Sequence, residues 1–350
     1  TVLLLGQALG TMATSILPAV APKVVESYGI SSALIGYQVS LISLAMLVSL
    51  VAGKIWVPPS AWGSTDPRWL IVMELRLPRT LLAAVVGAGL GLSGAAMQGY
   101  LRNPLADPGL FGVSASAALG AVISLFFGYS ASAWLLPIFA LTGAGVAMAL
   151  LALIVGRSAS LIVFTLAGVI LSSVAGSMTA LAISLAPTPF VTSQIVTWLM
   201  GALTDRSWND VALALPITAL GMGLLAMTGR ALDALTLGET TARTMGVDPL
   251  RLQILIVLGV GLCVGASVAA AGVIGFVGLI VPHLVRPFAG HRPSAVLLPS
   301  ALGGALLLLV ADSAVRALPT VSELRLGIAM SMLGGPFFLM LLLRMRRGLA

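Results

Sequence analysis

Apolar runs of about twenty residues follow one another along almost the whole chain, separated by short breaks of proline, glycine or arginine. Leu135–Val155 and Ala301–Val310, for example, contain no charged residue. A helix needs about 20 such residues to cross roughly 30 Å of hydrocarbon, and in lipid it satisfies every backbone polar group internally. A transmembrane β-barrel would show alternating segments of about ten residues instead. The runs therefore predict membrane-spanning helices.

The composition leads to the same class of protein. Of the 350 residues, 59% are hydrophobic and 8% are charged, whereas about 25% are charged in an average globular domain. So few charged side chains could not cover the surface of a soluble protein of this length. We predict an all-α fold, a polytopic integral membrane bundle of about ten transmembrane helices, or eleven if the N-terminus adds one.

The breaks give the expected order of the spans. One segment, residues 187–208, is amphiphilic and interrupted by proline, so we do not expect it to cross the membrane simply. The first span is expected to end near residue 53, and the others to occupy residues 71–98, 109–127, 133–155, 161–185, 211–227, 250–270, 274–285, 295–313 and 326–343.

The arginines predict the orientation of the bundle. Counted along alternating spans, ten arginines lie on the side of the basic C-terminal tail and six on the opposite side. Cytoplasmic loops carry an excess of Lys and Arg, so the tail side is predicted to be cytoplasmic. We attribute the net charge of +7 to this excess and expect no nucleic-acid partner. The six arginines on the outer side exceed what the rule prefers and predict a partner there: Arg68, Arg76, Arg79, Arg206, Arg316 and Arg325.

The sequence shows no motif that would power transport. The single Gly-Lys pair, Gly53-Lys54, lacks the upstream glycine of a phosphate-binding loop. The acidic residues lie nearly all in loops or at span ends, with Asp312 as the main exception. Arg316 follows Asp312 by one helical turn, so we expect a structural salt bridge, with a proton relay as the alternative. The chain is expected to be a passive conduit for transport that is powered by another protein.

Catalysis and resident cofactors are not expected. His283 and His291 have no carboxylate or cysteine at ligand spacing, so no metal site is predicted. The one cysteine, Cys263, lies in an apolar run and has no partner for a disulfide. Residues typical of a catalytic constellation are not found, and the first residues show no n-region or cleavage site of a removable signal peptide. We expect a protein that is not an enzyme and binds no cofactor.

Glycines crowd two of the predicted spans. Small residues at such spacings let helix backbones approach closely, which drives helix association in lipid. We therefore expect tight helix packing at both sets: Gly87, Gly89, Gly91 and Gly94 in one span, and Gly259, Gly261 and Gly265 in another.

Several longer motifs occur in a fixed order. Together they resemble the FecCD family of ABC-importer permeases, which serve iron–siderophore, haem and cobalamin uptake, and the resemblance covers the chain from about Leu41 to its end. The motifs are Arg76-Leu77-Pro78-Arg79, Gly94–Gln98, Arg102-Asn103-Pro104-Leu105-Ala106-Asp107-Pro108-Gly109, Leu237-Gly238-Glu239 with Ala242, Arg243 and Gly246, Gly272–His283 with Arg286, and Gly334-Gly335-Pro336-Phe337-Phe338.

The resemblance implies a permease subunit in the cytoplasmic (inner) membrane of a bacterium. Two such subunits, as a homodimer or a heterodimer, would surround a path for a metal chelate. The expected cargo is a ferric siderophore, with haem and cobalamin as alternatives. The implied partners are two cytoplasmic ABC ATPase subunits, an extracytoplasmic substrate-binding protein, the second permease subunit and membrane lipid.

The same resemblance assigns residues to three sites. Docking of the binding protein is assigned to Arg76, Arg79 and Arg316, with snorkelling anchors as the alternative reading. A cytoplasmic gate is assigned to Asn103 and Leu105, where a purely structural turn is the alternative. Coupling to the ATPase is assigned to a short helix and its flanks: Gly238, Glu239, Ala242, Arg243 and Gly246.

Residue spacing adds two details. Glu239 and Arg243 are four apart and are expected to stabilise the coupling helix by pairing. Met97 and Met200 are candidates to line the path, because methionine adapts to bulky ligands, with ordinary membrane core as the alternative.

Two segments depart from the family pattern. Arg325 stands where the family usually has proline, which affects the expected outer end of the last span. Residues 1–40 resemble the opening of a major facilitator carrier, so we divide the chain into an atypical hydrophobic segment, 1–40, and a FecCD-type permease domain, 41–350. An extra helix, a longer first span and a fused reading frame are the alternatives for this segment. It also suggests a rival function, a secondary carrier driven by an ion gradient; a receptor or scaffold is a third.

Overall fold

The computed structural model describes residues 30–129, 134–156, 161–319 and 323–347. Within these ranges every regular element is a helix, which confirms the predicted all-α fold. The ten main helices are α3 (Ser32–Val51), α5 (Leu77–Tyr100), α6 (Val113–Phe126), α7 (Leu135–Val155), α8 (Leu161–Ser184), α10 (Trp208–Ala226), α13 (Pro249–Ala271), α14 (Val277–Val285), α15 (Pro293–Ala317) and α16 (Leu326–Arg347).

Each predicted span overlaps one of these ten helices. Among the described residues, eight helical stretches are long and apolar enough to cross a membrane, and α6 and α14 are shorter apolar helices. The longest stretch joins α4 (Arg68–Leu70), the π-helical η3 (Ile71–Arg76) and α5 into one helix. The predicted interrupted segment contains the short helix α9 (Pro189–Leu199). The polytopic membrane bundle is therefore confirmed.

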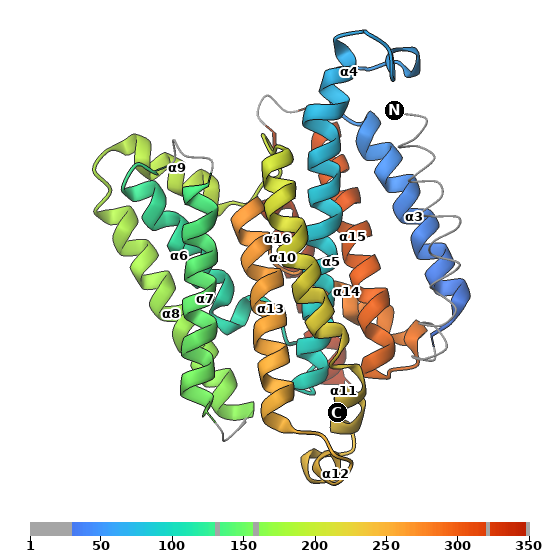
Figure 1. Cartoon of the computed structure of the whole chain (residues 1–350), viewed down its shortest axis with the longest axis vertical. Helices are drawn as coiled ribbons and strands as arrows, with labels where there is room; N and C mark the ends of the chain where they lie inside the picture. The colour runs from blue at the N-terminus through green and yellow to red at the C-terminus, as the bar shows by residue number, and fades with distance from the viewer. Residues whose placement is uncertain (1–29, 130–133, 157–160, 320–322, 348–350) are drawn as a thin grey trace.

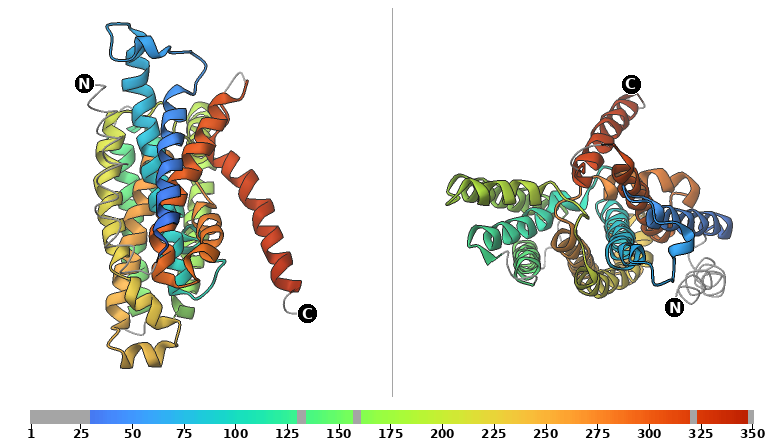
Figure 2. Two further views of the ribbon diagram at one scale, coloured as in Figure 1. Left: turned by 90° about the vertical axis from the view of Figure 1, so that its right-hand side faces the viewer. Right: turned by 90° about the horizontal axis from the view of Figure 1, so that it is seen from above.

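The helices run side by side, with α5, α10, α13 and α15 in the middle of the bundle (Figure 1). On one side lie α6, α7 and α8, and on the other lies α3. Two short helices, α11 (Gly229–Leu235) and α12 (Glu239–Thr244), lie at one end, which we call the α12 end; α4 lies at the opposite end, the α4 end. Figure 2 shows that α16 leaves the bundle at an angle.

Close packing of glycines joins the two central helices α5 and α15. A Cβ atom at Gly87 would lie 2.2 Å from the carbonyl oxygen of Gly304, and one at Gly91 would lie 2.1 Å from that of Ser300. The second predicted set also packs tightly, since a Cβ at Gly261 would meet the side chain of Met148 at 1.6 Å. The expectation of close helix contacts is confirmed.

Helix α14 is a half-length helix that packs against α5. It begins after Phe276, whose φ of 67° turns the chain from the preceding non-helical segment. A Cβ at Gly94 would lie 2.0 Å from the carbonyl oxygen of Gly278, so the two backbones touch. The buried Gln98 donates from Nε2 to that same carbonyl at 3.2 Å, and its Oε1 accepts from Arg286 at 2.7 Å. These contacts fix α14 to the half of α5 that is nearer the α12 end.

Helix α3 runs without interruption through residue 40. Its buried Gln38 donates from Nε2 to the carbonyl oxygen of Pro299 in α15 at 3.0 Å. Residues 32–40 therefore pack on the same bundle as the rest of α3, while residues 1–29, which hold most of the atypical segment, lie outside the described residues.

We expect Gly87→Ala to destabilise the protein. Alanine ordinarily stabilises a helix by about 1 kcal/mol relative to glycine, but here the added methyl group meets the backbone of α15. Overpacking of this kind destabilises by about 1–3 kcal/mol, so the midpoint of thermal unfolding in detergent should fall. The control is Gly176→Ala in α8, where a Cβ meets nothing within 4 Å. Equal shifts in the two variants would contradict the role of Gly87.

Candidate functional sites at the two ends of the bundle

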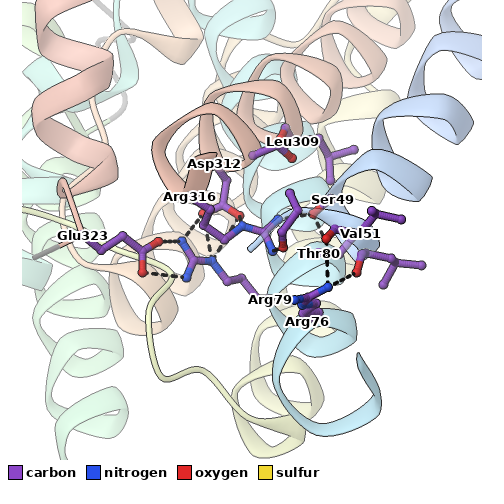
Figure 3. Close-up of polar contacts among 12 residues, drawn as sticks. Ser49, Val51, Arg76, Arg79, Thr80, Leu309, Asp312, Arg316 and Glu323 are labelled. Carbon is purple, nitrogen blue, oxygen red and sulfur yellow. Dashed lines mark hydrogen bonds and ion pairs between the residues drawn. The ribbon is translucent and has the colours of Figure 1, made fainter. Parts of the chain in front are cut away.

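A buried network of arginines and carboxylates lies at the α4 end, where α3 and α15 end and α5 begins (Figure 3). Its centre is Asp312 of α15, whose side chain is completely buried. One carboxylate oxygen of Asp312 lies 2.7 Å from Nη2 of Arg79, and the other lies 3.1 Å from Nε of Arg316. The predicted salt bridge between Asp312 and Arg316 is confirmed.

Arg79 also pairs with a second carboxylate. Its Nη1 donates to Oε2 of Glu323 at 3.2 Å, and its Nη2 contacts the other oxygen of the same group. Glu323 lies just before α16, so this one guanidinium links the start of α5, the end of α15 and the approach to α16. A planar guanidinium suits this role because its five N–H groups can serve two carboxylates at once.

The other two arginines bind the C-terminal end of α3. Arg76 donates from Nη1 to the carbonyl oxygens of Leu50 and Val51, both at 2.9 Å. Arg316 donates to the carbonyl oxygen of Ala52 at 3.2 Å and to the hydroxyl of Ser49. The last carbonyls of a helix have no partner within the helix and carry partial negative charge. The arginines therefore hold α3 against the centre of the bundle.

The three arginines assigned to docking thus lie together at the α4 end. Their guanidinium groups are buried or nearly so, and they are engaged by carboxylates and carbonyls of the same chain. With two carboxylates against three arginines, the network keeps one positive charge in excess. The docking role stays a prediction, and the structure adds that a partner would meet arginines already held in place.

At the α12 end, two glycines set the shape of the short helix α12. Gly238 has a φ of 101° and Gly246 a φ of 87°, a conformation that side chains with a Cβ adopt only under strain. Between them, Ala242 is buried, whereas Glu239 and Arg243 are exposed. The assigned coupling residues therefore form one unit that is fixed by Ala242 and presents its charged side chains outward.

The carboxylate of Glu239 pairs with a different arginine from the expected one. Its Oε1 lies 3.2 Å from Nη2 of Arg102, in the loop after α5. The predicted pair with Arg243 is wrong, because Arg102 reaches α12 from across the bundle end. This ion pair connects α12 to the loop that also carries the assigned gate.

The gate residues Asn103 and Leu105 belong to a tightly bonded turn. Asn103 accepts a hydrogen bond at its Oδ1 from the backbone N–H of Leu105 at 2.9 Å. Two residues on, Asp107 accepts at Oδ1 from the N–H of Gly109 at 2.7 Å and begins the short helix η4 (Pro108–Phe111). The turn is structurally specified by its own side chains, and its role as a gate stays a prediction.

Asp107 lines a cavity of about 220 Å³ beside the start of α14, together with Ser114 and Ser267. Burial raises the pKa of the Asp107 carboxyl, and the hydrogen bond from Gly109 opposes that rise.

Among the described residues, no group of three or more His, Cys, Asp or Glu is placed to hold a metal ion.

The two methionines differ. Met97 is 1% exposed and is part of the helix core, which favours the alternative reading of an ordinary core residue. Met200 follows α9 and is exposed.

Comparisons with known proteins point to one family of transport proteins. Residues 41–344 match the family described as the FecCD transport family. The chain is 37% identical to the uncharacterized ABC transporter permease protein YvrB of Bacillus subtilis, over 88% of this chain and 93% of that protein. It is 38% identical to the vitamin B12 import system permease protein BtuC of Salmonella typhi, over 88% and 94%. A solved inward-facing conformation of a metal-chelate type ABC transporter matches with a TM-score of 0.81 at 31% identity, over 89% of this chain and 98% of that one.

Asp312→Asn should destabilise the protein strongly. The substitution keeps the shape of the side chain but leaves two buried guanidinium groups without their shared counter-charge. Breaking a buried ion pair from one side destabilises by about 3–5 kcal/mol, which chemical unfolding in detergent would measure. Asp66→Asn is the control, since its pair with Arg68 is exposed and should leave the unfolding midpoint close to that of the wild type. A wild-type midpoint for Asp312→Asn would contradict the central role of this carboxylate.

The raised pKa of Asp107 predicts a pH dependence. Because the folded chain favours the protonated carboxyl, its stabilising contribution is complete below the ordinary pKa of 3.8 and is lost as the pH rises through the raised value. Asp107→Asn keeps an acceptor for Gly109 but does not titrate. Its unfolding midpoint should therefore rise relative to the wild type as the pH is increased above the ordinary pKa of 3.8. A difference that stays constant over this range would contradict the assignment.

Proposed function

This chain belongs to the FecCD transport family, and from that premise we propose that it carries a ferric siderophore into the cell with energy supplied by partner ATPases. It is a multi-pass permease of an ABC importer in the inner membrane, a transport component. A metal chelate as cargo is supported by the description of the matching solved structure. The name of BtuC keeps cobalamin as the second candidate.

The observation that carries the proposal is the unit formed by α11 and α12, in which α11 packs on the bundle and α12 is exposed except for Ala242. Helix α12 projects from the end of the bundle (Figure 1). Beside it, the apolar side chains of Leu237 and Met245 are 62% and 61% exposed. A short helix that shows both charged and large apolar side chains is suited to a cleft on another protein. We assign this cleft to an ABC ATPase subunit on the cytoplasmic side.

Two carboxylates connect this unit to the centre of the bundle. In α11, Asp233 accepts from the N–H of Ser294 at 2.9 Å and from its hydroxyl at 2.6 Å, which caps the start of α15. In α12, Glu239 pairs with Arg102 just after α5. A displacement of α11 and α12 by the ATPase would therefore act directly on the inner ends of α5 and α15, as a rigid-body movement.

At the opposite end, the network around Asp312 holds the outer ends of the same two helices. We propose that the binding protein docks here with acidic side chains, attracted by the one positive charge in excess. Docking and ATPase closure would then act on opposite ends of one rigid helix pair. Such a pair shifts between outward-open and inward-open states according to which state each partner binds better.

A second permease subunit completes the path. Helix α16 leaves the bundle (Figure 2), and its Met332 and Leu339 side chains are exposed. We propose that another permease subunit covers this helix on one side and lipid covers it on the other. Two ATPase sites and two docking surfaces for the binding protein follow from this twofold arrangement.

The rival function, a secondary carrier, receives no support from the relatives named above, which are ABC permeases. Asp312, the candidate for a proton relay, is engaged by two arginines. ATP-driven uptake therefore remains the proposal.

Uptake by proteoliposomes that contain the permease, its ATPase and its binding protein tests this function. Glu239→Ala combined with Arg243→Ala should lower chelate uptake about tenfold, the effect of losing ~1.4 kcal/mol at an interface, while ATP hydrolysis continues. Arg251→Ala, an exposed arginine of α13 outside the unit, is the matched control. Uptake that continues without ATP and stops when the proton gradient is removed would contradict the proposal.

A further inference from the structure

A cavity of about 390 Å³ lies at the α4 end, apart from the arginine network. Its walls come from α9, from the loop between α9 and α10, and from the residue before α16. Polar and apolar groups share these walls, and the polar side chains include Gln194, Thr197, Thr204, Asp205, Arg206 and Arg325. The start of α16 is fixed to the same loop, since the N–H of Gly327 donates to the carbonyl oxygen of Gly201 at 3.0 Å.

Arg206 is poorly partnered for a guanidinium that is only 20% exposed. Its closest carboxylate oxygen, on Asp210, is 3.9 Å away, which is too far for a hydrogen bond. That carboxylate is already used, because its other oxygen accepts from the backbone and the hydroxyl of Ser207 and caps α10. Within the part of the chain that the structure describes, Arg206 has an ion pair but no hydrogen bond, and its Nε atom is fully enclosed without a partner.

The electrostatics of the cavity wall favour an added negative charge. Burial lowers the pKa of Arg206, and the nearby charge of Arg325 lowers it further, although Asp210 and Asp205 oppose both effects. Arg325 itself donates to the hydroxyl of Thr204 at 3.2 Å and keeps other N–H groups for a ligand. Trp198, another wall residue, has an indole N–H that is enclosed and without a partner. The charged side chains that line the cavity are therefore two guanidinium groups and one carboxylate, that of Asp205.

We propose that this cavity is a subsite for an anionic oxygen group of the cargo, a carboxylate or a phosphate, held by Arg206 and Arg325. Two guanidinium groups at one cavity suit such a group because each can donate two parallel hydrogen bonds to it. This subsite rests on the proposed function, since it takes the chelate to be delivered at the α4 end. It narrows the cargo class to chelates that carry ionised oxygen groups.

The position of Arg325 supports a role in selection among chelates. It lies immediately before α16, the helix that leaves the bundle. An anion bound between Arg206 and Arg325 would connect the loop that follows α9 with the start of that helix. A neutral chelate would gain none of this attraction, because a charge-assisted hydrogen bond is about twice as strong as a neutral one.

The test measures binding of ferric citrate, which carries carboxylates, to the complete permease–ATPase complex in nanodiscs without the binding protein. A neutral ferric trihydroxamate is the second probe. Arg206→Gln and Arg325→Gln should each weaken ferric citrate binding about tenfold, corresponding to ~1.4 kcal/mol. Binding of the neutral chelate should keep its wild-type affinity in both variants. Arg68→Gln is the matched control, because Arg68 lies at the same end, pairs with Asp66 and does not line the cavity.

Trp198→Phe gives a second, milder variant that keeps the ring and removes only the N–H donor. Because Trp198 lines the cavity, the change in tryptophan fluorescence on addition of ferric citrate should be smaller in this variant than in the wild type. This difference would report occupancy of the cavity without any transport. Unchanged ferric citrate binding in Arg206→Gln and Arg325→Gln, or an equal loss in Arg68→Gln, would overturn the subsite. So would weaker docking of the binding protein in these variants with unchanged citrate binding, because the arginines would then serve the protein partner.

These outcomes separate the subsite from the proposed function. If ATP-driven import of a metal chelate persists while both glutamine variants bind ferric citrate as the wild type does, only the subsite fails. If the complex imports no metal chelate at all, the proposed function fails first.

Discussion

The carboxylate of Asp312 is the fixed point around which the α4 end is arranged. It is completely buried, and it faces Arg79 from α5 and Arg316 from its own helix. A single charge in such a place would be strongly unfavourable, so each member of the network requires the others. Because the participants come from α3, α5, α15 and the segment before α16, none of these elements can move away alone without leaving a buried charge behind.

The same two central helices are held at three levels. At the α4 end the charges around Asp312 join them, and in the middle their glycines bring the backbones into contact. At the α12 end, Asp233 caps α15 and Arg102, just after α5, pairs with Glu239. A helix pair joined in this way moves as a unit, because close-packed interiors shift between discrete arrangements and do not deform gradually. This makes it a suitable element to connect partners on the two faces of a membrane.

Local spacing allowed part of the site to be predicted. The pair between Asp312 and Arg316 is four residues apart on one helix, so the sequence alone indicates it. The same rule failed for Glu239 and Arg243, where Arg102 lies closer in the folded chain. The spacing rule also gives no information on Arg79, whose partners are 233 and 244 residues away. The one available signal was the surplus of arginines on the predicted outer side, which predicted negatively charged partners there. It did not indicate that two of these partners are carboxylates of the same chain.

The sequence by itself determined the spans, their order and the places of close helix contact, because apolar length and small residues act locally and depend little on the rest of the fold. Tertiary structure alone decided which charges meet. The packing of the helices sets where the segments between them lie, and it brings Glu323, just before α16, to Arg79 and brings Arg325 to the cavity beside Arg206. Residue spacing carries no information on such contacts, since they join segments that are distant along the chain.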